Sequence, residues 1–174
     1  MKTKLMLFLM IATVLSLSLT AQSAGFAPAY IAAGGGYSDT SKAGFAWVAY
    51  AKRTGVLNGT FPVYSYSEVR GYRFRDEAGT YRNATDFTTG FLFPFYAKTL
   101  LGFNVKLAVD GNIGLSTAPA NVGYTVGAKV VAAVGRPAWK KWGFVVSADP
   151  RRSSITGVQA SQISAGVTLA LNGL

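Results

Sequence analysis

Residues 84–98 of this 174-residue chain read ATDFTTGFLFPFYAK, and this stretch decides the class of fold. Phe87, Phe91, Phe93 and Phe95 are separated by even numbers of residues, so in an extended strand they lie on one face. The opposite face is smaller and more polar. A period of two over this length predicts a β-strand whose two faces meet different surroundings.

Seven further segments show the same period. They are residues 27–37, 44–53, 60–75, 100–110, 121–134, 139–149 and 155–171. Turn-forming residues separate them, for example Asn58-Gly59, Asp110-Gly111-Asn112 and Asp149-Pro150. The sequence therefore predicts an all-β fold, an antiparallel up-and-down β-barrel of about eight strands.

The aromatic residues Tyr64, Tyr66, Tyr72 and Phe74 of segment 60–75 share a face with Glu68 and Arg70. Such a mixed face is unusual for either side of a sheet. We expect a β-bulge near Gly71 to separate the apolar from the charged positions.

Residues 1–23 have the features of a signal peptide. Lys2 and Lys4 precede a nearly unbroken apolar run from Leu5 to Leu19, and Ala21-Gln22-Ser23 supplies small residues for cleavage. We expect export from the cytoplasm and a single β-barrel domain over residues 24–174.

The composition argues against most catalytic chemistry. The chain has no histidine and no cysteine, so it has neither a histidine-based triad nor a zinc site with such ligands. Its seven carboxylates are scattered. We therefore expect no enzymatic activity, no metal and no cofactor.

The two faces of the strands favour a membrane barrel over a soluble one. In a soluble sheet the outer face carries most of the charge, whereas here the less apolar face is chiefly Gly, Ala, Ser and Thr. Phe91, Phe93, Phe103 and Leu107 are expected to face lipid. The alternative is a soluble secreted or periplasmic β-barrel or β-sandwich that binds an apolar or anionic ligand.

In its signal peptide, its eight alternating segments and the Gly-rich first segment from Ala32 to Tyr37, the chain resembles the small eight-stranded outer-membrane barrels of the OmpA and OmpX type. The resemblance is one of pattern and has no diagnostic motif. It implies a place in the outer membrane and a narrow lumen filled by side chains, without an open pore. A structural or surface-interaction role is then expected.

Charged residues within the strands are the first candidates for a functional site. Buried charges must pair, so we predict an inward-facing network made of Glu68, Arg70, Lys106, Asp110 and Lys129. We expect it to fix the strand register.

Basic residues near the turns are the second group. After subtraction of Lys2 and Lys4, 15 of the 17 Lys and Arg remain against seven acids. Strand counting from a periplasmic N-terminus puts residues 38–43, 76–83, 111–121 and 150–154 outside the cell. We expect Arg82, Arg151 and Arg152 there to contact outer-membrane lipid, including the phosphates of lipopolysaccharide. No nucleic-acid partner is expected.

Overall fold

The computed structural model describes residues 27–38, 42–57, 61–75, 78–119, 121–136, 141–155, 157–159 and 162–171. The expected signal peptide lies outside these residues. Within them, regular structure consists of ten β-strand segments and no helix is long and apolar enough to cross a membrane. The segments are β1 (Ala29–Ser38), β2 (Ala43–Leu57), β3 (Phe61–Arg75), β4 (Tyr81–Leu100), β5 (Phe103–Ala118), β6 (Asn121–Gly135), β7 (Trp142–Ala148), β8 (Arg151–Ser153), β9 (Gly157–Gln159) and β10 (Gln162–Leu171).

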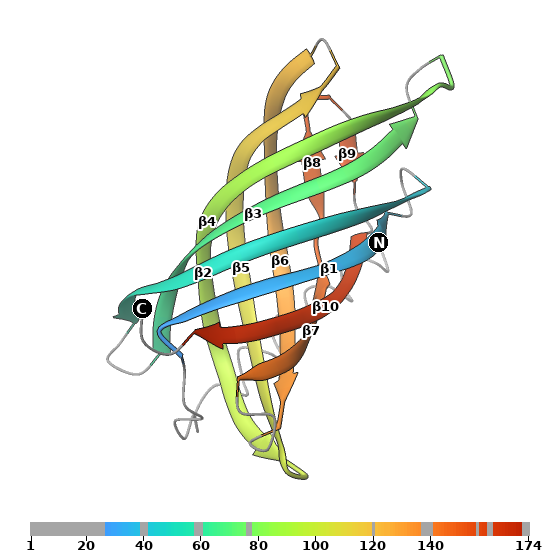
Figure 1. The fold of residues 1–174 in the computed structure, drawn as a ribbon. Coiled ribbons are helices and arrows are strands. Elements are labelled where there is room, and N and C mark those ends of the chain that lie inside the picture. The colour runs from blue at the N-terminus through green and yellow to red at the C-terminus, as the bar shows by residue number, and fades with distance from the viewer. Residues whose placement is uncertain are drawn as a thin grey trace, which may run out of the picture.

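The sheet closes on itself (Figure 1). Strands β1 to β7 pair antiparallel in chain order, and β10 lies between β7 and β1. Ala29 at the start of β1 is opposite Leu171 at the end of β10, so both ends of the barrel chain lie at one rim. We call this the terminal rim and the opposite one the loop rim. The prediction of an all-β antiparallel barrel is confirmed.

Segments β7 and β8 form one strand that Pro150 interrupts. Val130 of β6 is opposite Ala148, and Gly127 is opposite Arg151, so the register is the same on both sides of the gap. Proline has no N–H to give to the ladder, which explains the gap. Segments β9 and β10 pair with β8 and β7 in turn, and the register shifts by one residue between the two pairings. The described part of the barrel therefore has eight strands.

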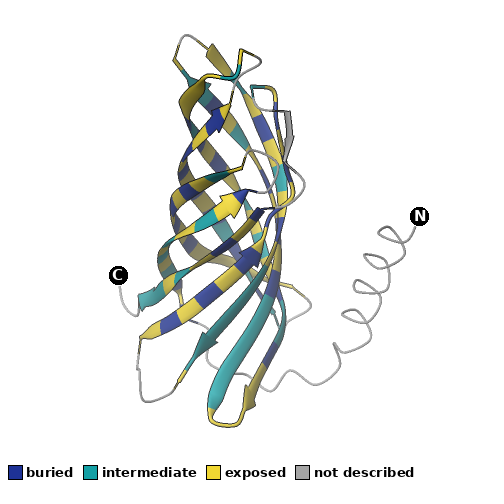
Figure 2. Ribbon diagram, turned by 90° about the vertical axis from the view of Figure 1, so that its right-hand side faces the viewer, coloured by how far each residue is buried: buried dark blue, intermediate teal, exposed yellow. Residues whose placement is uncertain are grey.

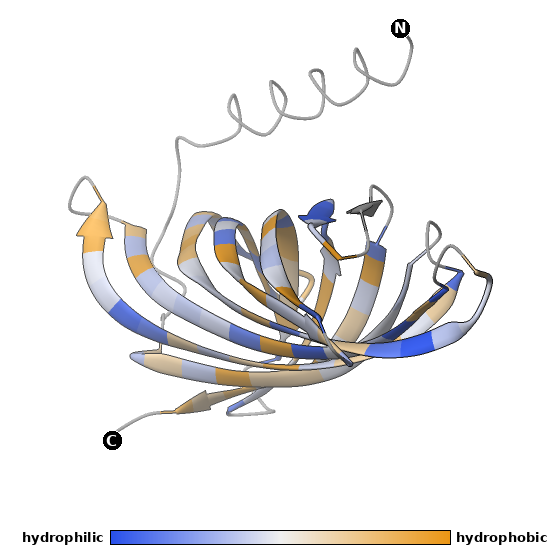
Figure 3. Ribbon diagram, turned by 90° about the horizontal axis from the view of Figure 1, so that it is seen from above, coloured by the Kyte–Doolittle hydropathy of each residue, from blue (hydrophilic) through white to orange (hydrophobic). Residues whose placement is uncertain are grey.

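Burial alternates along the strands (Figure 2). Large apolar side chains point outward, with exposed fractions of 53% for Phe91 and 62% for Ile113. Trp47 and Tyr66 point into the lumen and are buried. Viewed from above, hydrophilic and hydrophobic residues alternate along several strands (Figure 3). This is the two-face pattern that the sequence predicts.

Three local predictions are wrong. Asp110-Gly111-Asn112 is not a turn, because β5 runs through it and both polar side chains point into the lumen. The ladder between β2 and β3 is regular at Gly71 and shifts instead between Arg53 and Gly55. Phe103 is the first residue of β5 and lies at the terminal rim rather than at the middle of the barrel wall.

A two-residue turn joins β4 to β5. Leu100 is opposite Phe103, and both residues between them have positive φ, 50° for Leu101 and 78° for Gly102. This is the geometry of a type I′ hairpin. Glycine adopts it without strain, whereas leucine does not.

The glycine run of β1 has a steric cause. A Cβ atom on Gly34 would lie 2.1 Å from the carbonyl oxygen of Ala165 in β10. A Cβ on Gly36 would lie 2.3 Å from the ring of Phe45. Small residues here let β1 approach β10 and leave room for the aromatic ring in the lumen.

Candidate functional site

The inward face of β3 carries the centre of the site. Tyr64, Tyr66, Glu68, Arg70 and Tyr72 are consecutive inward residues, and all are buried. The strand face that carries both aromatic and charged residues therefore points entirely into the lumen. A narrow barrel is filled by such side chains.

Glu68 accepts hydrogen bonds from three cations. Its Oε1 lies 2.8 Å from Arg70 Nη2 and 3.3 Å from Arg151 Nη2. Its Oε2 pairs with Lys129 of β6 and also accepts the hydroxyl of Tyr66. The carboxylate thereby links β3 to strands on the far side of the lumen.

Arg151 and Arg70 extend these contacts to two more acids. Arg151 Nη1 lies 3.1 Å from Asp86 Oδ2, and Arg151 Nη2 lies 3.0 Å from Asp149 Oδ2. Arg70 pairs with Asp149 as well and donates to the side chain of Gln162 in β10. Contacts of this one cluster therefore reach β3, β4, β6, β8 and β10.

We call these six charged residues the lumen cluster: Glu68, Asp86, Asp149, Arg70, Lys129 and Arg151. Three acids face three bases, and every side chain is buried. Buried charges of one sign would be strongly destabilised, whereas paired and hydrogen-bonded charges are tolerated. Pairing and hydrogen bonding explain how so much charge is held in the middle of the barrel.

Hydroxyl groups continue the cluster toward the loop rim. Ser116 Oγ donates to Asp86 Oδ1 at 2.7 Å, and the Tyr72 hydroxyl donates to the same oxygen at 3.1 Å. Ser153 Oγ lies 3.1 Å from Ser116 Oγ. The lumen is thus occupied by hydrogen-bonded side chains on this side of the cluster.

The predicted network residues divide into two groups. Glu68, Arg70 and Lys129 lie together in the cluster. Asp110 is buried next to it and accepts a hydrogen bond from Asn112 at 2.7 Å. Lys106 lies nearer the terminal rim, where its Nζ donates to the Tyr30 hydroxyl at 3.2 Å.

The expected lipid contacts lie on both sides of the wall. The side chains of Arg82 and Arg152 are exposed. Arg151 is only 4% exposed and belongs to the lumen cluster, which does not agree with a lipid contact. The difference arises because Pro150 interrupts the strand without ending it. Residue 151 therefore points to the same inward face as residue 149.

Sequence reasoning missed Asp86 and Asp149, and it placed Arg151 among the lipid contacts instead of in the lumen cluster. The alternation of inward and outward positions was a usable signal for Asp86 and Asp149. Asp86 alternates with outward Phe87, and Asp149 follows Val145 and Ser147 on the same face. Arg151 could not be found in this way once residues 150–154 were read as a loop.

Among the residues that the structure describes, no group of three or more acidic, histidine or cysteine side chains could hold a metal ion. The site is defined by charge pairing inside a closed barrel. Together, the closed eight-stranded ladder and the apolar outer face define a small β-barrel of the outer-membrane type, as the resemblance implied.

No family model and no curated protein matches the chain. A solved structure to which the barrel is similar is the outer membrane enzyme PagL, at 10% sequence identity and a TM-score of 0.49, over 82% of this chain and 99% of that chain. Set against this finding, our prediction that the chain is not an enzyme is not maintained. The likeness concerns the fold, and it assigns no catalytic role to any residue here.

Proposed function

We propose that this protein is an integral outer-membrane barrel with a closed lumen, whose structural or surface-interaction role is carried by its rims and outer face. The observation that carries the proposal is the lumen cluster. Its six charged side chains meet across the lumen, in the cross-section through which an open channel would have to pass.

The outer face supports membrane insertion. Outward positions on β5 include Phe103, Leu107, Val109, Ile113 and Leu115. At a rise of ~3.4 Å per residue and a tilt of ~45°, the distance from Phe103 to Leu115 corresponds to about 29 Å across the membrane. This is close to the apolar band of ~25 Å on outer-membrane barrels and to a hydrocarbon core of ~30 Å.

The same face argues against the soluble alternative. Soluble monomers rarely expose apolar patches above a few hundred Å², yet Phe87, Ile113, Phe144 and Ile163 on four different strands are each about half exposed or more. A sandwich is excluded by the closed ladder. A soluble barrel would need a partner to cover this belt.

Cell fractionation tests the location. We expect the protein in the outer-membrane fraction, resistant to alkaline extraction, with a gel mobility that changes on boiling. Recovery in the soluble fraction without detergent would refute the membrane proposal and favour the soluble barrel.

Planar-bilayer recording tests the closed lumen. We expect no stepwise conductance from the wild-type chain. A variant with Arg70→Ala and Arg151→Ala removes two of the three cations and should introduce conductance if it still folds. Steady channel steps in the wild-type protein would refute the closed lumen without affecting its location.

We further propose that exposed Arg82 and Arg152 contact anionic lipid. Guanidinium groups bind phosphate oxygens with two parallel hydrogen bonds. Neutralising both to Gln should weaken binding to lipopolysaccharide, most clearly at low salt, since exposed charges are screened at a Debye length of ~10 Å in 0.1 M salt. Unchanged binding at low salt would refute this contact.

A further inference from the structure

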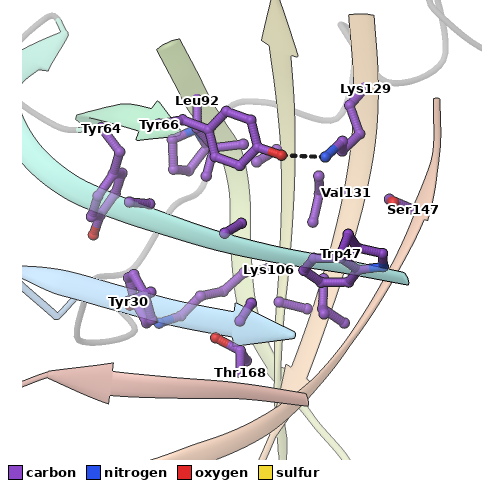
Figure 4. Close-up of a pocket in the computed structure, with 17 residues that line it drawn as sticks. Tyr30, Trp47, Tyr64, Tyr66, Leu92, Lys106, Lys129, Val131, Ser147 and Thr168 are labelled. Atoms are coloured by element: carbon purple, nitrogen blue, oxygen red, sulfur yellow. Dashed lines mark hydrogen bonds between the residues drawn. The ribbon is translucent and has the colours of Figure 1, made fainter. Parts of the chain in front are cut away.

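A cavity of about 140 Å³ lies in the lumen between the lumen cluster and the terminal rim. Its wall is almost wholly apolar and aromatic, with side chains from β2, β3, β4, β6 and β7 (Figure 4). Its apolar and aromatic lining includes Tyr30, Trp47, Tyr64, Tyr66, Leu92, Val131 and Val145. The lumen cluster and its hydrogen-bonded hydroxyl groups lie on one side of this cavity, whereas the cavity itself favours hydrocarbon.

The two ends of the cavity differ. Toward the cluster it is closed by Lys129, whose Nζ donates to the Tyr66 hydroxyl (Figure 4). Toward the terminal rim it meets a second, wider pocket of about 320 Å³, which we call the mouth. Tyr30, Lys106, Ala133 and Thr168 line both spaces, so the mouth adjoins the apolar cavity.

The mouth is basic. Lys106, Arg136 and Lys141 line it, and none of its described lining residues is acidic. The guanidinium of Arg136 lies 4.2 Å from the centre of the Phe103 ring, which holds it at the rim. An apolar cavity behind a basic entrance is complementary to a molecule with a hydrocarbon tail and an anionic head.

We propose that the terminal half of the lumen binds a single-chain amphiphile with a short tail in the cavity and an anionic head at the mouth. The volume sets the length of the tail. An apolar protein cavity of ~150 Å³ stays dry and binds benzene, so a cavity of this size holds a tail of about six carbons. Each buried methylene is worth ~0.8 kcal/mol, or about fourfold in affinity, until the cavity is full.

Quenching of Trp47 by brominated ligands tests the proposal. Replacing Trp139 and Trp142 by Phe leaves Trp47 as the reporter inside the cavity. The folded chain in nanodiscs of zwitterionic lipid is titrated with 6-bromohexanoate, and with 6-bromohexanol as the uncharged probe. We expect saturable quenching by the carboxylate and at least tenfold weaker binding of the alcohol.

Two variants separate the cavity from the surrounding lipid. Ala108→Leu fills the cavity and should abolish saturable quenching, whereas Ala128→Leu makes the same change on the outer face and should leave it intact. Lys106→Met should weaken binding of the carboxylate but not of the alcohol. Heat-modifiable mobility on gels shows in each case that the barrel is folded.

Three results would overturn the proposal. Quenching that rises linearly with probe concentration would mean partition into lipid only. Equal quenching of the parent and a folded Ala108→Leu variant would exclude the cavity. Equal affinity for the carboxylate and the alcohol would exclude an anionic head. None of these results depends on where the protein is located in the cell.

Discussion

Removing the charge of Glu68 is the sharpest test of the lumen cluster. In Glu68→Gln, the cations Arg70, Lys129 and Arg151 would remain with two acids in place of three. Glu68 is 2% exposed, so water cannot compensate the lost charge. Breaking a buried ion pair on one side costs about 3–5 kcal/mol. We expect the free energy of unfolding to fall by about that amount.

The assay is urea unfolding in lipid vesicles, followed by tryptophan emission and by gel mobility. Ser67→Ala is the matched control, because Ser67 is the neighbouring outward residue and its change should stay within about 0.5 kcal/mol. Adding Lys129→Met to Glu68→Gln restores equal numbers of acids and bases and should recover part of the loss. The reasoning would be refuted by a Glu68→Gln barrel within about 1 kcal/mol of the parent.

Three further changes test other parts of the fold by the same unfolding assay. Leu101→Asn replaces a leucine at positive φ by a residue suited to a type I′ turn, and should stabilise the barrel by about 1 kcal/mol; lower stability would contradict the turn assignment. Val109→Arg puts a charge on the outer face midway along β5 and should cost about 2–4 kcal/mol in a bilayer, with no cost expected if that face meets water. Gly34→Ala forces a side chain against β10 and should cost about 1–3 kcal/mol, whereas Gly71→Ala meets open space and should be neutral; equal effects would refute the steric account.

The sequence was sufficient for the class of fold because a period of two extends over every strand. Phe87, Phe91 and Phe93 lie on one face of their strand by this alternation, and the same rule places Lys129 inside. The two-residue alternation is a local property of each strand, so it predicts the correct face even where the position of a turn is predicted wrongly. The closed antiparallel barrel follows from it together with the number of segments.

The predictions failed where a polar stretch was interpreted as a turn, although the alternation of inward and outward residues continued through it. Asp110-Gly111-Asn112 has the composition of a turn, but polar side chains two residues apart are also what a lumen face requires. Arg151 was read as a loop residue because Asp149-Pro150 looks like a strand end. In both cases the residue is buried by strands that lie far away in the sequence. A local sequence pattern does not contain that information, so it cannot distinguish a lumen position from a turn.

The cavity and the contacts of the lumen cluster could not be predicted for a similar reason. Arg70 and Asp149 are 79 positions apart in the sequence and are brought together only when the barrel closes. Which inward residues meet across the lumen depends on the stagger of all the strands. The sequence identifies the inward residues but not their partners.

The arrangement of charges along the chain bears on how the barrel is assembled. Strands β3 to β6 bring Glu68, Arg70, Asp86 and Lys129, but Asp149 and Arg151 come only with the last part of the chain. Until that part arrives, Asp86 lacks its cation and Arg70 lacks one of its two acids. A half-formed sheet therefore holds exposed charges that favour water over lipid, and the same step that closes the seam between β1 and β10 also neutralises them. We therefore expect insertion into the membrane to be coupled to completion of the chain, with partial barrels staying at the surface of the bilayer.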